Sequence, residues 1–219
     1  EKGWHFTIKP KLWILFGGLV VPDLGEIRNE EAYQSISSKF SKSLIAAPIV
    51  TISVLSLTLI TFIILMIFNT HTHFNGIFTI LTLYITILSL FYIYTFRLSN
   101  QMFYGDFVAH KKMNTDEIFK LAEINQYTMF TMEESDETIQ FLWEKSKSII
   151  KDKPISTTMF YIMILTNYLD GIIRMNYETD PIIDQKIKGL NINALCRTEH
   201  GLSMAYDLCF YDYHQGLVE

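Results

Sequence analysis

The stretch LIAAPIVTISVLSLTLITFIILMIF, residues 44–68, decides the fold of this chain. It contains 25 consecutive residues without a charged side chain. A second uncharged stretch, IFTILTLYITILSLFYIYTF, occupies residues 77–96. As helices rising about 1.5 Å per residue, the two stretches would be about 37 and 30 Å long, and the hydrocarbon core of a bilayer is about 30 Å thick. The sequence therefore predicts two transmembrane helices.

The two predicted helices form an antiparallel hairpin, because only the eight residues NTHTHFNG, 69–76, separate them. Asn and Gly are turn formers, and eight residues are enough to reverse the chain. The alternative is a pair of helices in a soluble core. That alternative is uncommon for two consecutive segments that are apolar on every face.

The charges that flank the hairpin predict its orientation. Lys39 and Lys42 precede the first helix, Arg97, Lys111 and Lys112 follow the second, and the connecting loop has no Lys or Arg. By the positive-inside rule, both termini are expected on the cytoplasmic or matrix side of an integral membrane protein.

The composition excludes several classes of protein. The chain of 219 residues is 49% hydrophobic and 19% charged, which argues against intrinsic disorder. Its net charge is -5, and no basic stripe of the kind that binds nucleic acid is present. Two cysteines are too few for a disulfide scaffold. The expected partners are the lipid bilayer and other transmembrane helices, in a hetero-complex or a homo-oligomer.

Small and hydroxylated residues recur along one side of each predicted span. In lipid, close backbone approach and hydroxyl hydrogen bonds favour helix association, because burial of apolar surface contributes no driving force there. The predicted helix-packing seams are Ala47, Thr51, Thr58 and Thr61 on the first helix and Thr79, Thr82, Thr86 and Ser89 on the second. The sequence leaves open whether the seams meet each other, meet a partner subunit or line a pore.

The N-terminal segment, residues 1–43, combines lysines with aromatic residues, as interfacial membrane segments do. Its apolar part, residues 12–22, is too short to span a bilayer, so we expect it to lie on the inner membrane surface or to be re-entrant. Docking onto the soluble part is the alternative. The predicted interfacial residues of the chain are Trp4, Trp13, Tyr92, Tyr94 and Arg97.

The remaining residues, 97–219, predict a soluble bundle of helices on the inner side. Amphipathic patterns favour helices over about 115–130, from 135 to just before Pro154, over 156–177 and over 202–213. Asn114 and Ser135 stand where helix N-caps are expected. The apolar segment TTMFYIMIL is too short for a third span and is predicted to be a buried core helix. The fold class is thus an all-α membrane protein with a hairpin at 44–96.

One group of residues could bind a metal ion. Cys196 and His200 are four residues apart, and Cys209 and His214 are five apart. Two Cys and two His side chains could enclose a tetrahedral zinc ion. The usual structural zinc pattern pairs Cys with Cys and His with His, and the alternative is that Cys209 is a small core residue on the last helix.

Three functions are compatible with this organisation. The favoured one is a non-catalytic accessory or scaffold subunit that docks other transmembrane helices and an inner-side partner, because no common catalytic motif is present. A second is a homo-oligomeric ion channel or membrane-disrupting effector gated by the soluble helices, although neither span contains an ionisable residue. A third is a membrane-anchored, zinc-dependent enzyme.

Overall fold

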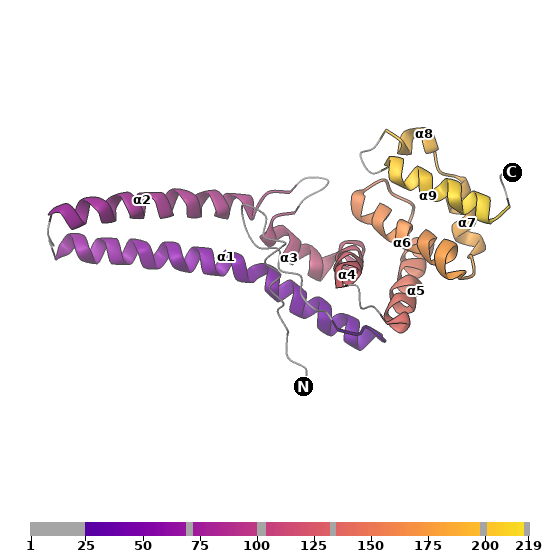
Figure 1. Cartoon of the computed structure of the whole chain (residues 1–219), viewed down its shortest axis with the longest axis horizontal. Coiled ribbons are helices and arrows are strands. Elements are labelled where there is room, and N and C mark those ends of the chain that lie inside the picture. The colour runs from indigo at the N-terminus through magenta and orange to yellow at the C-terminus, as the bar shows by residue number, and fades with distance from the viewer. Residues whose placement is uncertain (1–24, 69–71, 100–103, 132–134, 198–200, 217–219) are drawn as a thin grey trace. The chain divides into compact units, whose positions relative to one another are not determined.

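The computed structural model describes residues 25–68, 72–99, 104–131, 135–197 and 201–216 (Figure 1). In chain order the helices are α1 (Glu30–Ile67), α2 (Thr72–Thr95), α3 (Asp106–Thr115), α4 (Glu117–Thr131), α5 (Asp136–Asp152), α6 (Met159–Met175), α7 (Pro181–Lys188), α8 (Ile192–Leu195) and α9 (Gly201–His214). Within the described ranges, strand pairing is limited to an isolated bridge between Ser99 and Tyr104. The prediction of an all-helical fold is confirmed.

The chain divides into two compact units with bounds that differ from the predicted domains 1–43, 44–96 and 97–219. Unit 2 is Ser38–Thr115, and unit 1 combines Glu1–Ser37 with Asp116–Glu219. The short helix α3 therefore belongs with the hairpin. The first turns of α1 belong with the C-terminal bundle.

In unit 2, α1 and α2 are long, apolar and side by side (Figure 1). By length and composition both could cross a membrane. The predicted connecting loop, 69–76, was too long, because α2 already begins at Thr72. A helix end that lies beyond the apolar segment can carry polar side chains. The helix α2 therefore begins inside the predicted polar loop, at Thr72.

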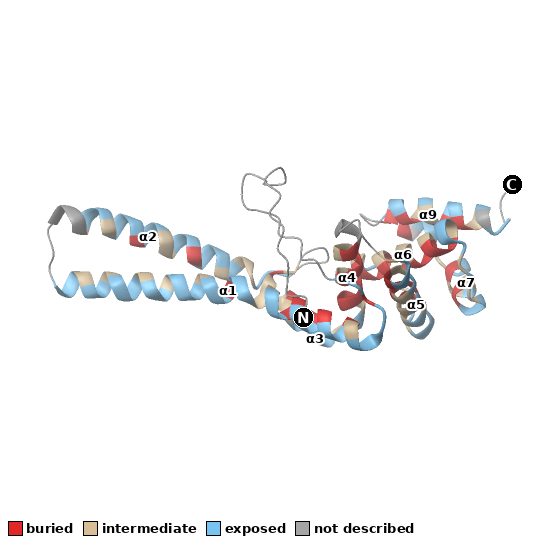
Figure 2. Ribbon diagram, turned by 60° about the horizontal axis from the view of Figure 1, so that its bottom comes forward, coloured by how far each residue is buried: buried red, intermediate tan, exposed pale blue. Residues whose placement is uncertain are grey.

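In unit 1, α6 is the central helix and packs against α4, α5 and α9. Its buried side is red in Figure 2 and consists of Phe160, Tyr161, Ile162, Ile164, Leu165, Tyr168, Leu169, Gly171 and Ile172. The prediction that this apolar segment is a buried core helix is confirmed. Its neighbours supply enough apolar surface to bury it within the protein.

The beginning of α1 is anchored in unit 1 by side chains from α5. The Asn29 side chain caps α1 by accepting a hydrogen bond from the Ala32 amide at 2.8 Å. The Ile27 amide donates to Thr138 Oγ1 at 2.9 Å. Tyr33 is fully buried, with the Lys145 ammonium 4.3 Å from its ring centroid.

Of the two predicted helix N-caps, one is confirmed by the structure and the other is wrong. Ser135 caps α5, as predicted, by accepting from the Thr138 amide. At α4 the predicted cap, Asn114, is wrong. Asp116 Oδ1 accepts from the Ile118 amide at 3.1 Å and so caps this helix. Asn114 instead donates to the Ser41 hydroxyl, a contact that sequence spacing cannot reveal.

Candidate functional site

The exposed apolar surface of α1 and α2 is the first candidate site in the described residues. Leu57, Ile67 and Ile80 are 64%, 71% and 71% exposed, and large hydrophobic side chains are exposed along both helices (Figure 2). In each helix we considered the 18 consecutive residues that are most apolar. None of these residues is buried in α1, and 11% of them are buried in α2. A core helix of a soluble protein would be mostly buried. These two helices have an apolar surface that no described part of the chain covers.

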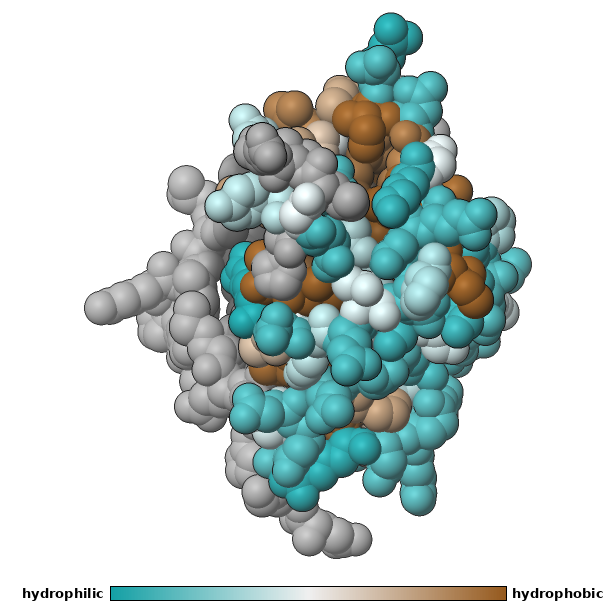
Figure 3. All heavy atoms as spheres, turned by 90° about the vertical axis from the view of Figure 1, so that its right-hand side faces the viewer, coloured by the Kyte–Doolittle hydropathy of each residue, from teal (hydrophilic) through white to brown (hydrophobic). Residues whose placement is uncertain are grey.

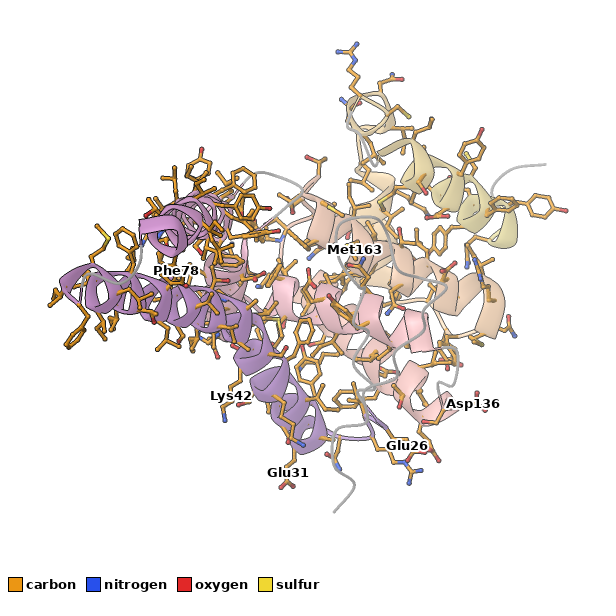
Figure 4. The ribbon with its side chains drawn as sticks, turned by 60° about the vertical axis from the view of Figure 1, so that its left-hand side comes forward. Glu26, Glu31, Lys42, Phe78, Asp136 and Met163 are labelled. Atoms are coloured by element: carbon orange, nitrogen blue, oxygen red, sulfur yellow. The ribbon has the colours of Figure 1, made fainter. Side chains whose placement is uncertain are left out.

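The less exposed residues of α1 and α2 lie along one side of each helix. On α1 after residue 46, the less exposed residues recur at spacings of three and four, which is the period of coiled-coil packing. They are Pro48, Thr51, Leu55, Thr58, Phe62 and Leu65. Across from them, the Phe78 ring stacks with Phe62 at a centroid distance of 6.4 Å, and Figure 4 shows Phe78 between the helices.

These less exposed sides include some of the predicted seam residues and omit others. Thr82 and Ser89 are each 6% exposed, and Thr51, Thr58 and Thr86 are partly buried. The other three, Ala47, Thr61 and Thr79, are exposed. Five of the eight predicted seam residues are thus buried or partly buried. Docking of partner helices by the seams stays a prediction.

At the end of α2 the chain turns sharply into α3. The Gly105 amide donates to the Leu98 carbonyl at 2.8 Å, and the Phe107 amide donates to the Phe96 carbonyl at 3.1 Å. A Cβ atom on Gly105 would lie 2.3 Å from the Thr95 carbonyl oxygen, so only glycine allows this approach. These hydrogen bonds hold the start of α3 against the end of α2.

The other end of α3 is held to α1 by Ser41. Asn114 Nδ2 donates to Ser41 Oγ at 2.7 Å, and His110 Nδ1 lies 2.9 Å from the same oxygen and 2.7 Å from the Ser41 carbonyl oxygen. Ser41 is 2% exposed. No sequence pattern indicates this cluster, because its members are 69 and 73 residues apart.

The Ser41 and His110 pair does not have the geometry of a catalytic nucleophile and base. A carbonyl oxygen only accepts hydrogen bonds, so the contact with the Ser41 carbonyl places the proton on His110 Nδ1. In that tautomer Nδ1 cannot take a proton from the hydroxyl. Since Ser41 is also buried, the cluster serves as a structural clamp between α1 and α3.

The predicted interfacial residues on α2 and after it are exposed. Tyr92 and Tyr94 are 43% and 64% exposed, and Arg97, which follows them, is exposed. Their rings and hydroxyls are therefore accessible at the charged end of the apolar segment. Trp4 and Trp13 lie outside the described residues.

A second exposed apolar surface lies on α9. This helix buries Met204, Leu208 and Tyr211, and its opposite side exposes four large side chains at helical spacing. These are Leu202, Tyr206, Phe210 and Tyr213, with exposed fractions of 58%, 65%, 61% and 70%, and we call them the α9 face. In the view of Figure 3, hydrophobic side chains reach the surface among hydrophilic ones. Exposed apolar patches of this kind mark interaction surfaces.

The predicted zinc ligands are described only in part. Cys196 and Cys209 are free and exposed. His200 and the side chain of His214 lie outside the described residues. Among the side chains that are described, no three His, Cys, Asp or Glu residues form a group that could hold a metal ion. Zinc binding stays a prediction.

Two carboxyl groups of unit 1, Asp170 on α6 and Asp207 on α9, have polar partners on α6. Thr166 Oγ1 donates to Asp207 Oδ2 at 3.2 Å, and Arg174 Nε pairs with Asp170 at 3.2 Å. Partial burial raises the pKa of both carboxyls, and the Asp170 charge further raises the pKa of Asp207. Because the Arg174 guanidinium and the Thr166 hydroxyl satisfy these groups, they form a structural polar contact.

No protein-family profile, curated protein or solved structure matches this chain.

Proposed function

We propose that this protein is a non-catalytic membrane scaffold, anchored by α1 and α2 and docking an inner-side partner through its helical bundle. The observation that carries the proposal is the exposed apolar surface of the two helices. Burying large hydrophobic side chains removes an unfavourable contact with water worth about 1.5–3 kcal/mol for each fully buried residue. Insertion into a bilayer would provide that burial for both helices at once.

The internal hydrogen bonding of the hairpin supports this proposal. Helices satisfy their backbone groups within one segment, as the lipid interior requires. Hydroxyls on the apolar segment are also compatible with lipid when they bond their own backbone, and Ser56 Oγ donates to the Ile52 carbonyl at 2.8 Å. The charges that begin at Arg97 mark where the apolar segment ends.

The α9 face supports the docking part of the proposal. Aromatic side chains such as Tyr206 and Phe210 provide large contact areas at low entropic cost, and they are enriched in protein interfaces. Their exposure leaves them available to a partner. The orientation of the hairpin, with both termini on the cytoplasmic or matrix side, follows from the positive-inside rule and belongs to the same proposal.

Alkaline carbonate extraction and cysteine labelling test the membrane anchor. The full chain should stay in the membrane pellet. In a background with Cys196→Ser and Cys209→Ser, Gly76→Cys should react with an impermeant maleimide from the outer side of sealed vesicles. The parent cysteines should react only after the vesicles are opened. Release of the protein by carbonate would refute the anchor, and inner-side labelling of Gly76→Cys would refute the orientation.

Native mass spectrometry of detergent extracts tests the scaffold role. The parent should show a stoichiometric foreign partner, and Tyr206→Ser with Phe210→Ser should lose it. The matched control is Ile182→Ser with Met175→Ser, which removes two exposed hydrophobic side chains outside the α9 face. A closed ring of identical chains, without a foreign partner, would favour the channel hypothesis instead.

A further inference from the structure

The charges of the chain are distributed unequally between its two units. Unit 2, residues 38–115, has five of the 18 Lys and Arg residues and only one of the 23 Asp and Glu residues. That single acid, Asp106, is half-buried, and burial raises its pKa. Unit 2 is thus strongly basic within a chain of net charge -5.

All five basic residues of unit 2 lie outside the apolar segments 44–68 and 77–96. We call them the basic collar: Lys39, Lys42, Arg97, Lys111 and Lys112. The first four are exposed, and Lys112 lies 5.4 Å from the centroid of the Tyr104 ring. Figure 4 shows the Lys42 side chain extending away from α1.

Two sets of hydrogen bonds bring the collar together at one end of the hairpin. At the α1 side, the Ser41 clamp holds the last turn of α3, with Lys111 and Lys112, beside the turn of α1 that contains Lys39 and Lys42. At the α2 side, the bonds from Gly105 and Phe107 hold the first turn of α3 beside Arg97. Basic residues far apart in sequence are therefore held on neighbouring segments at the same end of the hairpin. Tyr92 and Tyr94, which precede Arg97 on α2, are also exposed.

We propose that the basic collar binds the phosphate groups of anionic lipids, so that the hairpin selects acidic lipids from the leaflet at its charged end. Lys and Arg near an anionic membrane surface each favour binding about fivefold, and this effect is screened by salt. The positive charge of the collar is complementary to an anionic lipid headgroup. The apolar surface proposed to enter the bilayer also continues directly into the collar. This inference rests on the proposed membrane anchor.

Electron paramagnetic resonance with spin-labelled lipids tests the collar. The full chain is reconstituted into phosphatidylcholine vesicles that contain trace spin-labelled phosphatidylglycerol or phosphatidylcholine. For each labelled lipid, the association constant with the shell of lipid around the protein is measured. The readout is the ratio of the phosphatidylglycerol constant to the phosphatidylcholine constant. The parent should prefer phosphatidylglycerol severalfold at low salt, and the preference should fall as salt rises.

Two triple variants separate the collar from the overall charge. Lys42→Gln, Arg97→Gln and Lys111→Gln should lower the ratio toward one, with Lys39 and Lys112 retaining part of the preference. Lys153→Gln, Lys188→Gln and Arg197→Gln remove the same charge from unit 1 and should leave the ratio unchanged. All three collar positions are exposed, and unchanged circular dichroism checks that the fold persists.

The remaining outcomes distinguish this inference from the anchor. A carbonate-resistant parent with equal association of both lipids would overturn the collar and leave the anchor intact. An equal loss of preference in both triple variants would also overturn it, because the overall charge would then be the cause. If inorganic phosphate abolished the preference but chloride of equal ionic strength did not, the surface would be a site for free phosphate and not for lipid. Extraction of the parent by carbonate would overturn both proposals.

Discussion

The Trp143 indole stacks on the ring of Tyr168, with centroids 5.5 Å apart and planes 9° apart, and its Nε1 donates to the Tyr168 carbonyl at 2.9 Å. This contact joins α5 to α6 in the centre of unit 1. The indole can lie this close to α6 because Gly171 has no side chain. A Cβ atom there would be 2.2 Å from Trp143 Cδ1.

Gly171→Ala should destabilise unit 1 by about 1–3 kcal/mol, because the added methyl group forces the indole out of its position. The loss should occur although Ala otherwise favours a helix interior by about 1 kcal/mol. Urea unfolding of the full chain in detergent, followed by far-ultraviolet circular dichroism, measures it. Gly189→Ala is the control, since its Cβ would make only ordinary contacts, at 3.5 Å. An unfolding free energy equal to the parent's would contradict this packing.

Gly105→Ala should loosen the junction between α2 and α3. The new Cβ would clash with backbone atoms of Thr95 and Phe96, which cannot move as a flexible side chain can. Hydrogen–deuterium exchange of the full chain in nanodiscs should show faster exchange of the Gly105 and Phe107 amides. Gly76→Ala, with no atom within 4 Å of its Cβ, should leave exchange at the junction unchanged. Parent-like protection in Gly105→Ala would show that the close approach is not required.

Ser41→Ala should weaken the attachment of α3 to α1 by about 1 kcal/mol, because it removes the hydroxyl that accepts from Asn114. The readout is faster hydrogen–deuterium exchange over α3. Ser43→Ala is the control, since Ser43 Oγ donates only to the Phe40 carbonyl of its own helix, at 2.7 Å. Similar exchange in the two variants would mean that the Ser41 hydroxyl contributes nothing to the clamp.

Glu123 should make the stability of unit 1 depend on pH. Burial raises the pKa of this α4 carboxyl from 4.5 to about 7, so the folded state retains a proton that the unfolded state has lost. The unfolding free energy should therefore fall as pH rises from about 4.5 to about 7, by at most about 3 kcal/mol. Glu123→Gln should flatten this slope, as measured by urea unfolding at several pH values. Glu144→Gln, an exposed position on α5, should retain it.

The sequence by itself determined the helical class and the two long apolar segments. Both follow from local properties, namely the absence of charge over residues 44–68 and 77–96 and the periodicity of apolar residues after Arg97. The Ser135 cap was also readable, because a cap acts within one helical turn. The apolar segment around Tyr161 was correctly placed in a core, since its length excluded a third span.

Only the tertiary structure decided how distant residues meet. The Ser41 clamp, the Asn114 contact and the basic collar depend on where α3 packs, and side-chain contacts between segments some 70 residues apart leave no periodic signal in the sequence. For the same reason the sequence left open what the segment at the start of α1 contacts. The Ile27 amide, just before α1, donates to Thr138, which is 111 residues away, and the burial that stabilises this bond comes from helices that sequence periodicity treats separately.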